Sequence, residues 1–186
     1  LKEEDSSYKL LVKKTKIAFL FTVPIFIIAM AEMFPGNPLL KIISQKSWNW
    51  VQFLLAIPVI FFAAWMFFER AWKSVITGNL NMFTLIGIGT TVSFLFSCIG
   101  LLFPDIFPAQ FKTESGTVFV YFEATTVILS LVLLGQLLEA RAHGQTSSAL
   151  KELLKLAPTK ATLVAADGVD KTISIQAIVV GNLLRV

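Results

Sequence analysis

The sequence predicts an α-helical membrane protein with four transmembrane helices, an interfacial amphipathic helix and the start of a β-rich domain. Hydrophobic residues make up 55% of the 186 residues, against about 45–50% in an average soluble protein. Charged residues contribute only 15%, and the apolar residues gather in four runs separated by polar segments. Each run approaches the ~20 residues with which a helix crosses ~30 Å of hydrocarbon.

The four runs define the predicted transmembrane segments, which are Ile17–Met33, Trp48–Phe68, Phe83–Phe103 and Val118–Leu138. Pro24 and Pro58 lie inside the first two runs. Transmembrane helices tolerate proline where neighbouring groups satisfy the freed backbone carbonyl, so we expect a kink near each. Trp48, Trp50 and Trp65 lie near the two ends of the second run. Tryptophan is enriched at both membrane interfaces, which supports these boundaries.

The distribution of basic residues predicts the orientation. Lysine and arginine gather before the first run, between the second and third, and after the fourth. Four spans place these three segments on one side, and the positive-inside rule makes that side the cytoplasm. Residues 1–16 are therefore expected to be a cytoplasmic N-terminal segment. The net charge of +4 favours anionic lipid headgroups, and we expect no nucleic-acid partner.

A polar interruption at residues 67–78 separates the second run from the third. On a helix, apolar side chains would gather on one face and polar side chains on the other. The apolar set is Phe68, Ala71, Trp72, Val75 and Ile76, and the polar set is Glu69, Arg70, Lys73 and Thr77. Gly78 supplies a stop. The pattern predicts an interfacial helix near 67–78, although a second helix that protrudes from the membrane fits it equally well.

The character of the chain changes after the four-helix region, which we place at 17–143. Thr146–Leu156 either extends the fourth helix or forms a short amphipathic one, and Pro158 stops it. The stretch ATLVAADGVDKTISI predicts a β-hairpin around Asp167-Gly168, and NLLRV predicts a further strand. So few strands bury too little core to be stable alone. Residues 144–186 are therefore expected to begin a larger domain.

Ionisable side chains at membrane depth are costly and are functional candidates by default. Glu123 lies about five residues into the fourth run, Glu139 marks its other end, and Glu32 closes the first run, where we interpret it as interfacial. Met82 begins the third run, at the level expected for Glu139. A thioether suits Cu(I), and a carboxylate beside it would give a weak, exchangeable site. Ordinary helix packing is the alternative reading for Met82.

Cys98 is the one cysteine of the chain and lies inside an apolar run. A single cysteine excludes an internal disulfide framework and a metal site built from paired cysteines of this chain. We interpret it as a small packing residue.

Several stretches together resemble one family. The runs ERAWKSVITGNLNMFTLIGIG, VYFEATTVILSLVLLGQLLEARAHGQTSSALKELLKLAP and VVGNLLRV closely resemble bacterial copper-transporting P-type ATPases of the heavy-metal class. The resemblance implies that the first two spans precede the common core, that the next two open it, and that residues 144–186 begin the actuator domain. It also implies a platform after the second span that receives copper. In that family Met82 and Glu139 match the uptake residues, and Glu123 matches a residue of the release route.

The resemblance further implies Cu(I) as the transported ion, with ATP and Mg²⁺ required only in the complete pump. The implied partners are the lipid bilayer, a copper donor protein or chaperone, and the remaining pump domains; the implied location is the bacterial inner (plasma) membrane. One departure is Ala63-Ala64, where the family usually carries a Gly-Gly pair. Alanine is the better helix former by ~1 kcal/mol per residue, so a weaker or displaced bend is expected.

The sequence contains no phosphorylation motif, no dephosphorylation loop, no nucleotide-binding domain and no membrane Cys-Pro-Cys motif. Phosphoryl transfer needs an acceptor and phosphate-binding groups, so we expect this chain to hold no catalytic residues and not to hydrolyse ATP alone. The preferred interpretation is the N-terminal membrane fragment of a Cu(I)-exporting pump. The alternatives are a pump for Ag(I), or a non-catalytic membrane remnant or interaction subunit.

Overall fold

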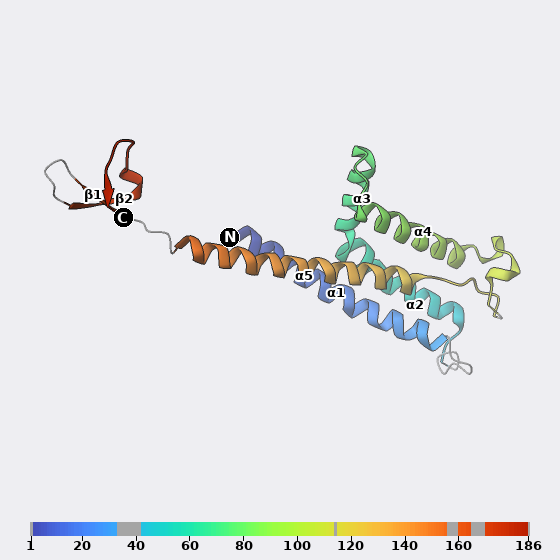
Figure 1. Ribbon diagram of the computed structural model, residues 1–186. Coiled ribbons are helices and arrows are strands. Elements are labelled where there is room, and N and C mark those ends of the chain that lie inside the picture. Colours follow the sequence, from blue (N-terminus) through green and yellow to red (C-terminus); the bar gives the residue numbers. More distant parts are fainter. Residues whose placement is uncertain (1, 33–41, 114, 156–159, 165–169, 186) are drawn as a thin grey trace. The chain divides into compact units, whose positions relative to one another are not determined.

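The computed structural model describes residues 2–32, 42–113, 115–155, 160–164 and 170–185. The chain divides into two compact units, Leu1–Glu139 and Ala140–Val186. The helices, drawn in Figure 1, are α1 (Lys2–Glu32), α2 (Gln45–Pro58), α3 (Trp65–Thr77), α4 (Met82–Leu102) and α5 (Phe122–Lys155). A π-helical segment, Val59–Ala63, connects α2 to α3. Helix α5 begins in the first unit and ends in the second.

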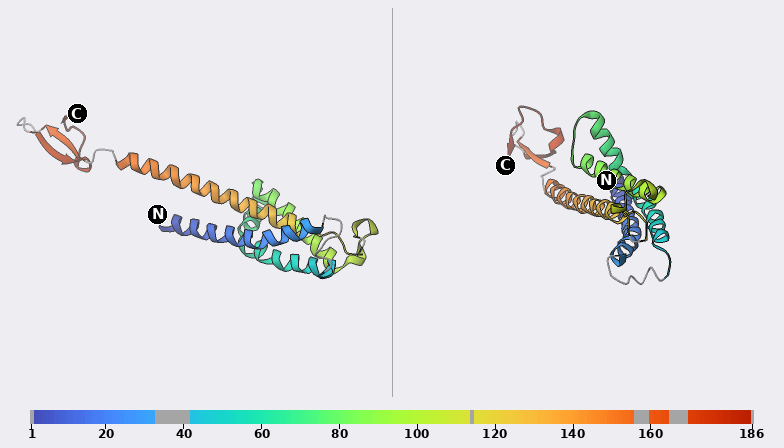
Figure 2. Two further views of the ribbon diagram at one scale, coloured as in Figure 1. Left: turned by 90° about the horizontal axis from the view of Figure 1, so that it is seen from below. Right: turned by 90° about the vertical axis from the view of Figure 1, so that its right-hand side faces the viewer.

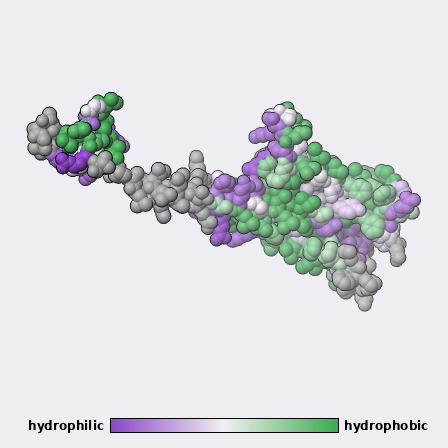
Figure 3. All heavy atoms as spheres, in the orientation of Figure 1, coloured by the Kyte–Doolittle hydropathy of each residue, from purple (hydrophilic) through white to green (hydrophobic). Residues whose placement is uncertain are grey.

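Among the described residues, four helical stretches are long and apolar enough to cross a membrane. They are Ser6–Glu32, Gln45–Ala63, Met82–Leu102 and Phe122–Gly144. The prediction of an α-helical membrane protein with four spans is therefore confirmed. Figure 3 shows hydrophobic residues over much of the visible face of the first unit, with hydrophilic residues largely at its margins. This distribution suits a bundle surrounded by lipid.

Two predicted boundaries are wrong. The second span ends at Ala63 rather than Phe68, because the helix is interrupted and α3 starts at Trp65. The fourth helix starts at Phe122 rather than Val118, because Val118 forms an antiparallel bridge with Lys112 before the helix begins. Helix α1 also extends beyond its predicted span. It begins at Lys2, so the predicted N-terminal segment is helical where it is described.

The core of the first unit lies among α1, α2, the π-helical segment and α5. Its fully buried members include Ile25, Val59, Phe122, Leu129 and Leu133. Within the first unit, α1 lies beside the first half of α5, where Thr22 meets Ser130 (Figure 2).

Hydroxyl pairs join the helices within this core. Thr22 Oγ1 of α1 and Ser130 Oγ of α5 are 2.8 Å apart, and Thr125 Oγ1 of α5 donates to Ser93 Oγ of α4 at 3.0 Å. A bilayer core offers no water to buried hydroxyls, so such pairs fix which helix faces meet.

The chain changes direction after Pro58. From Val59 to Ala63 the backbone is π-helical, and the N–H of Ala64 donates to Val59 O at 2.9 Å. Ala64 has φ −98° and ψ 0°, outside the helical range, and α3 follows at once. The break therefore lies at Ala63-Ala64, and the better helix propensity of alanine does not remove it. The kink expected near Pro58 takes this form, whereas α1 runs uninterrupted through Pro24.

Helix α3 carries three faces rather than the two that its sequence suggested. Its buried face contains Phe67, Ala71 and Ser74. An exposed apolar face follows around the helix and consists of Trp65, Trp72, Val75 and Ile76. The charged face consists of Glu69, Arg70 and Lys73, with the polar Thr77 on the same side. The alternative of one continuous second helix is wrong, because Ala71 packs on the bundle and α3 is a separate helix.

Helices α3 and α4 approach each other most closely at two small residues. A Cβ atom added to Gly87 of α4 would collide with the Cβ of Ala71 on α3. One turn away, the hydroxyls of Ser74 and Thr84 form a hydrogen bond between the same helices. Small residues at a crossing let two membrane helices come into backbone contact.

The second unit carries a three-stranded antiparallel sheet in the order β2-β1-β3. Strand β1 (Lys160–Val164) pairs with β2 (Asp170–Ser174) in the register Thr162↔Thr172, and with β3 (Leu184–Arg185) in the register Leu163↔Leu184. The predicted hairpin and the further strand are confirmed. Helix α5 continues to Lys155, so the segment after Gln145 extends the fourth helix. The expected turn at Asp167-Gly168 and the stop at Pro158 lie outside the described residues.

The α3–α4 contact makes a first prediction. We expect Gly87→Ala to lower the free energy of unfolding by about 1–3 kcal/mol, because the added methyl group must push α3 away. Gly89→Ala is the matched control, since a Cβ there meets nothing within 4 Å. Thermal unfolding in detergent, followed by circular dichroism, measures both. Equal midpoints for the two variants would contradict the close approach.

Candidate functional site

A short turn between α3 and α4 sets the position of Met82. Helix α3 ends at Gly78, whose φ of 70° lies in the left-handed region that glycine adopts without strain. Ser74 Oγ donates to the carbonyl oxygen of Asn79 and also bonds the Thr84 hydroxyl. The same serine thus holds both the turn and the first turn of α4.

Asn81 caps α4 immediately before Met82. Its Oδ1 accepts from the backbone N–H groups of Phe83 at 2.9 Å and Thr84 at 3.4 Å, and its own N–H donates to Thr84 Oγ1 at 3.0 Å. This reciprocal capping box satisfies N–H groups that a helix start leaves unpaired. Met82 is the first residue of α4 and is 56% exposed. Its thioether is accessible from outside the bundle.

Arg70 connects the start of α4 with Glu139. Its Nη1 donates to Gln136 Oε1 at 3.1 Å, and Gln136 Nε2 donates to Glu139 Oε2 at 2.8 Å. The guanidinium carbon of Arg70 also lies 4.9 Å from the ring centroid of Phe83, the neighbour of Met82. Met82 and Glu139 thus lie at one end of the bundle, here called the Met82 end, linked through an arginine on α3.

Glu123 lies at the opposite end, here called the Glu123 end. It is the second residue of α5 and is half-buried, so it lies nearer the helix start than the sequence suggested. At 1.5 Å per residue, roughly 24 Å of helix separates it from Glu139. The three predicted site residues therefore form one pair at the Met82 end and a single carboxylate far from it.

Glu32 is held more firmly than an interfacial residue would be. Gln52 Nε2 of α2 donates to Glu32 Oε1 of α1 at 2.9 Å, and Gln52 is only 1% exposed. Sequence reasoning missed Gln52, although an amide in the middle of an apolar run is a signal in itself. It also missed the link through Arg70 and Gln136, because their contact depends on how α3 packs.

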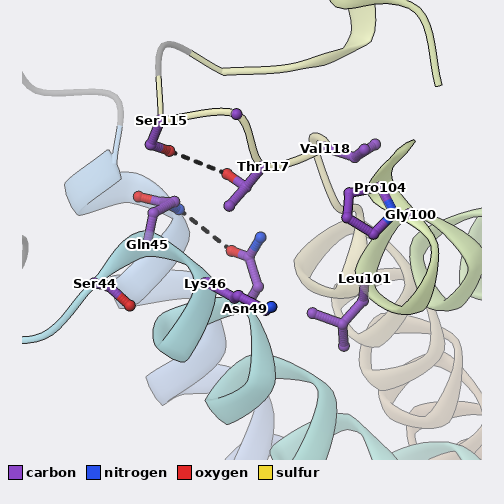
Figure 4. A pocket seen from close by; sticks show the side chains of 11 residues that line it. Ser44, Gln45, Lys46, Asn49, Gly100, Leu101, Pro104, Ser115, Thr117 and Val118 are labelled. Carbon is purple, nitrogen blue, oxygen red and sulfur yellow. Dashed lines mark hydrogen bonds between the residues drawn. The ribbon is translucent and has the colours of Figure 1, made fainter. Parts of the chain in front are cut away.

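A cavity of about 250 Å³ lies at the Glu123 end, between the start of α2, the end of α4 and the loop before α5 (Figure 4). Gln45, Asn49, Thr117, Gly100 and Val118 are among the residues that line it. Gln45 Nε2 donates to Asn49 Oδ1 at 3.3 Å, and Ser115 and Thr117 share a hydrogen bond. The wall from α2 is therefore polar, and the wall from α4 is apolar.

The chemistry differs between the two ends. The Met82 end offers one soft sulfur donor and one carboxylate, which suit transient binding of a soft monovalent ion. Within the described residues, no group of three or more histidine, cysteine, aspartate or glutamate side chains could hold a metal ion.

Comparison with known proteins identifies clear relatives. No family model matches the chain. It is 45% identical over 170 residues to a copper-exporting P-type ATPase of Legionella pneumophila, which covers 91% of this chain and 23% of that protein. It is 42% identical over 171 residues to a silver exporting P-type ATPase of Salmonella typhimurium, and 39% identical over 175 residues to a copper-transporting P-type ATPase of Rhizobium leguminosarum. These matches cover 20% and 21% of those two proteins. The chain thus spans about a fifth of the length of these curated relatives.

The capping of α4 makes a second prediction. We expect Asn81→Ala to destabilise the start of α4 by about 1 kcal/mol, because two backbone N–H groups lose their acceptor. Hydrogen exchange at the amides of Phe83 and Thr84 should accelerate accordingly. Asn79→Ala serves as the control, since Asn79 contributes only its backbone carbonyl to this turn. Unchanged exchange in Asn81→Ala would show that the cap does not hold Met82.

Proposed function

This chain is homologous to part of the copper-transporting P-type ATPases, and on that premise we propose that it supplies the copper uptake surface and part of the release route of a Cu(I)-exporting pump. The observation that carries the proposal is the link from Phe83 through Arg70 and Gln136 to Glu139. These contacts join the start of α4, where the Met82 side chain is exposed, to the part of α5 that carries Glu139. Cu(I) is the cargo that such a donor pair suits.

Met82 is the proposed first ligand. Its exposure lets a donor protein reach the sulfur, and the capping box of Asn81 and Thr84 keeps α4 from fraying at this residue. A single thioether binds Cu(I) weakly enough to release it again. Rapid exchange is what a transfer site requires, since a tighter set of ligands would trap the ion.

Glu139 is the proposed second ligand, and Arg70 and Gln136 position it. Gln136 donates to one carboxylate oxygen, Oε2. The Arg70 guanidinium lies on the charged face of α3 and stacks on the Phe83 ring. A lysine at this position would lack the planar set of donors and could not stack in this way. A movement of α3 would therefore be transmitted to both proposed ligands.

Helix α3 is the proposed platform that receives copper at the membrane surface. Trp65, Trp72, Val75 and Ile76 form an exposed apolar face that suits the lipid interface. The adjacent charged face, with Glu69, Arg70 and Lys73, would then point toward water and an incoming donor protein or chaperone. The basic residues around α3 and at both ends of the chain favour the cytoplasm of a bacterial inner membrane as the side of uptake.

Glu123 is proposed to contribute to release on the far side of the membrane, where its carboxylate is a poor ligand for Cu(I) and gives the ion up. Transport itself would require the rest of the pump, with ATP and Mg²⁺ driving phosphoryl transfer there. We assign no catalytic residue to this chain.

Ag(I) is the second candidate cargo, because one relative is named a silver exporter and is 42% identical. Thioether and carboxylate ligands do not separate the two ions. ATP hydrolysis by the complete pump should therefore be stimulated by Cu(I) or Ag(I), and this measurement with Cu(I), Ag(I) and Zn(II) tests the assignment. Stimulation by Zn(II) alone would contradict the ligand argument.

Substitution of Met82 tests the proposed first ligand. We expect Met82→Leu to leave the fold intact, because the side chain is exposed and leucine has similar volume. Transfer of Cu(I) from a coloured bicinchoninate complex to the chain in lipid nanodiscs should become at least several-fold slower. Met66→Leu is the control, since Met66 is partly buried against the core. Equal transfer rates in wild type and Met82→Leu would reduce Met82 to a packing residue.

A further inference from the structure

Glu32 of α1 lies near polar side chains of two other helices at the Glu123 end. Glu32 of α1 accepts a hydrogen bond from Gln52 of α2 at 2.9 Å, and its carboxylate lies within electrostatic range of Glu123 on α5. Helices α1 and α5 run in opposite directions (Figure 1) and meet at Thr22 and Ser130. At 1.5 Å per residue, Glu32 and Glu123 then differ in depth by only about 5 Å.

Helices α2 and α5 also pack against each other at this depth. The rings of Phe53 on α2 and Phe122 on α5, which are the sequence neighbours of Gln52 and Glu123, have centroids 5.6 Å apart. The Glu123 carboxylate is itself fixed by backbone N–H groups of the first turn of α5. The three side chains are thus placed by helix packing.

Gln52 leaves one oxygen unsatisfied at this point. Its Nε2 donates to Glu32, so the amide is oriented with the Oε1 atom on its other side. Within the described part of the chain, this buried Oε1 has no hydrogen-bond partner. Nearly all buried polar atoms in proteins have a partner, so an orphaned acceptor beside the Glu32 carboxylate needs an explanation.

The cluster has an excess of acceptors. Glu32 accepts hydrogen bonds from the Gln45 and Gln52 amides, and Glu123 accepts from backbone N–H groups at the start of α5, whereas Gln52 Oε1 has no donor within the described residues. Oxygen atoms of this kind are the ligands of hard cations such as Ca²⁺ and Mg²⁺, whereas Cu(I) prefers sulfur. A hard cation would satisfy Gln52 Oε1 and relieve the repulsion between the carboxylates.

A polar path leads to the cluster from the cavity at this end. Gln45, Asn49 and Gln52 follow one another at four- and three-residue spacing, so they line one face of α2. Gln45 and Asn49 line the cavity in Figure 4 and are hydrogen-bonded to each other. Lys46 also lines this cavity. Its single positive charge does not offset the two negative charges of the Glu32 and Glu123 carboxylates.

We propose that Glu32, Gln52 and Glu123 form a binding site for a hard, oxygen-preferring cation, which enters through the cavity between α2, α4 and the loop before α5. The site is separate in chemistry from the sulfur ligand at the Met82 end. It does not depend on copper transport, although it shares Glu123 with the proposed release route. Occupation by a hard cation would exclude Cu(I) from these carboxylates.

Terbium luminescence tests the site without copper. Tb³⁺ substitutes for hard oxygen-bound cations, and Trp50 lies two residues from Gln52, where it can sensitise terbium emission. With the 186-residue chain in phosphatidylcholine nanodiscs, we expect saturable emission that Ca²⁺ or Mg²⁺ displaces. Glu32→Gln and Gln52→Leu should each weaken Tb³⁺ binding at least tenfold. Asp105→Asn, an exposed carboxylate at the same end, should leave it unchanged.

The outcomes separate this proposal from the copper assignment. Emission that is absent, non-saturable, or equally strong in Glu32→Gln would overturn the cation site. Glu32→Gln keeps the size of the side chain, so it decides the matter even if Gln52→Leu fails to fold, as judged by circular dichroism. Loss of Cu(I) transfer in Met82→Leu bears only on the other end of the bundle.

Discussion

Small side chains let α3 pack closely on α4, and this contact decides where the candidate copper ligands lie. Ala71 meets Gly87, and Ser74 bonds Thr84 one turn away. With α3 held in this way, Arg70 reaches both Phe83 and Gln136. A helix that merely lay on the membrane would have no such connection, so α3 is joined by direct contacts to the helices that carry the two proposed ligands.

The absence of water in a bilayer core explains the remaining polar contacts. Thr22 with Ser130, and Ser93 with Thr125, satisfy each other across helix interfaces, as buried hydroxyls must in lipid. Gln52 departs from this rule, because its oxygen is buried and unpartnered within the described residues. The exception lies beside the Glu32 carboxylate at the far end from Met82. The proposed sulfur ligand and the proposed hard-cation site therefore lie at different ends of the bundle.

Hydropathy and composition were sufficient to predict the four spans and the hairpin of the second unit, whereas the amphipathic pattern after the second span fitted a separate helix and a continuous one equally well. Boundaries were less accurate, since Val118 belongs to a bridge with Lys112 and the π-helical segment ends the second span at Ala63. The break at Ala63-Ala64 could not be judged from helix propensity, because buried packing and the preceding Pro58 decide it. Met82, Glu139 and Glu123 were chosen from residue type and resemblance, and their roles stay predictions. Their link through Arg70 and Gln136, and the role of Gln52, depend on tertiary contacts between distant segments.

X-ray absorption spectroscopy of the Cu(I)-loaded chain can show whether a thioether and a carboxylate at the Met82 end together receive the ion. We expect a first shell with one sulfur and one or more oxygen ligands, in which the sulfur contribution disappears when Met82 is replaced by leucine and the oxygen contribution falls when Glu139 is replaced by glutamine. A first shell that is unchanged by both substitutions would contradict it.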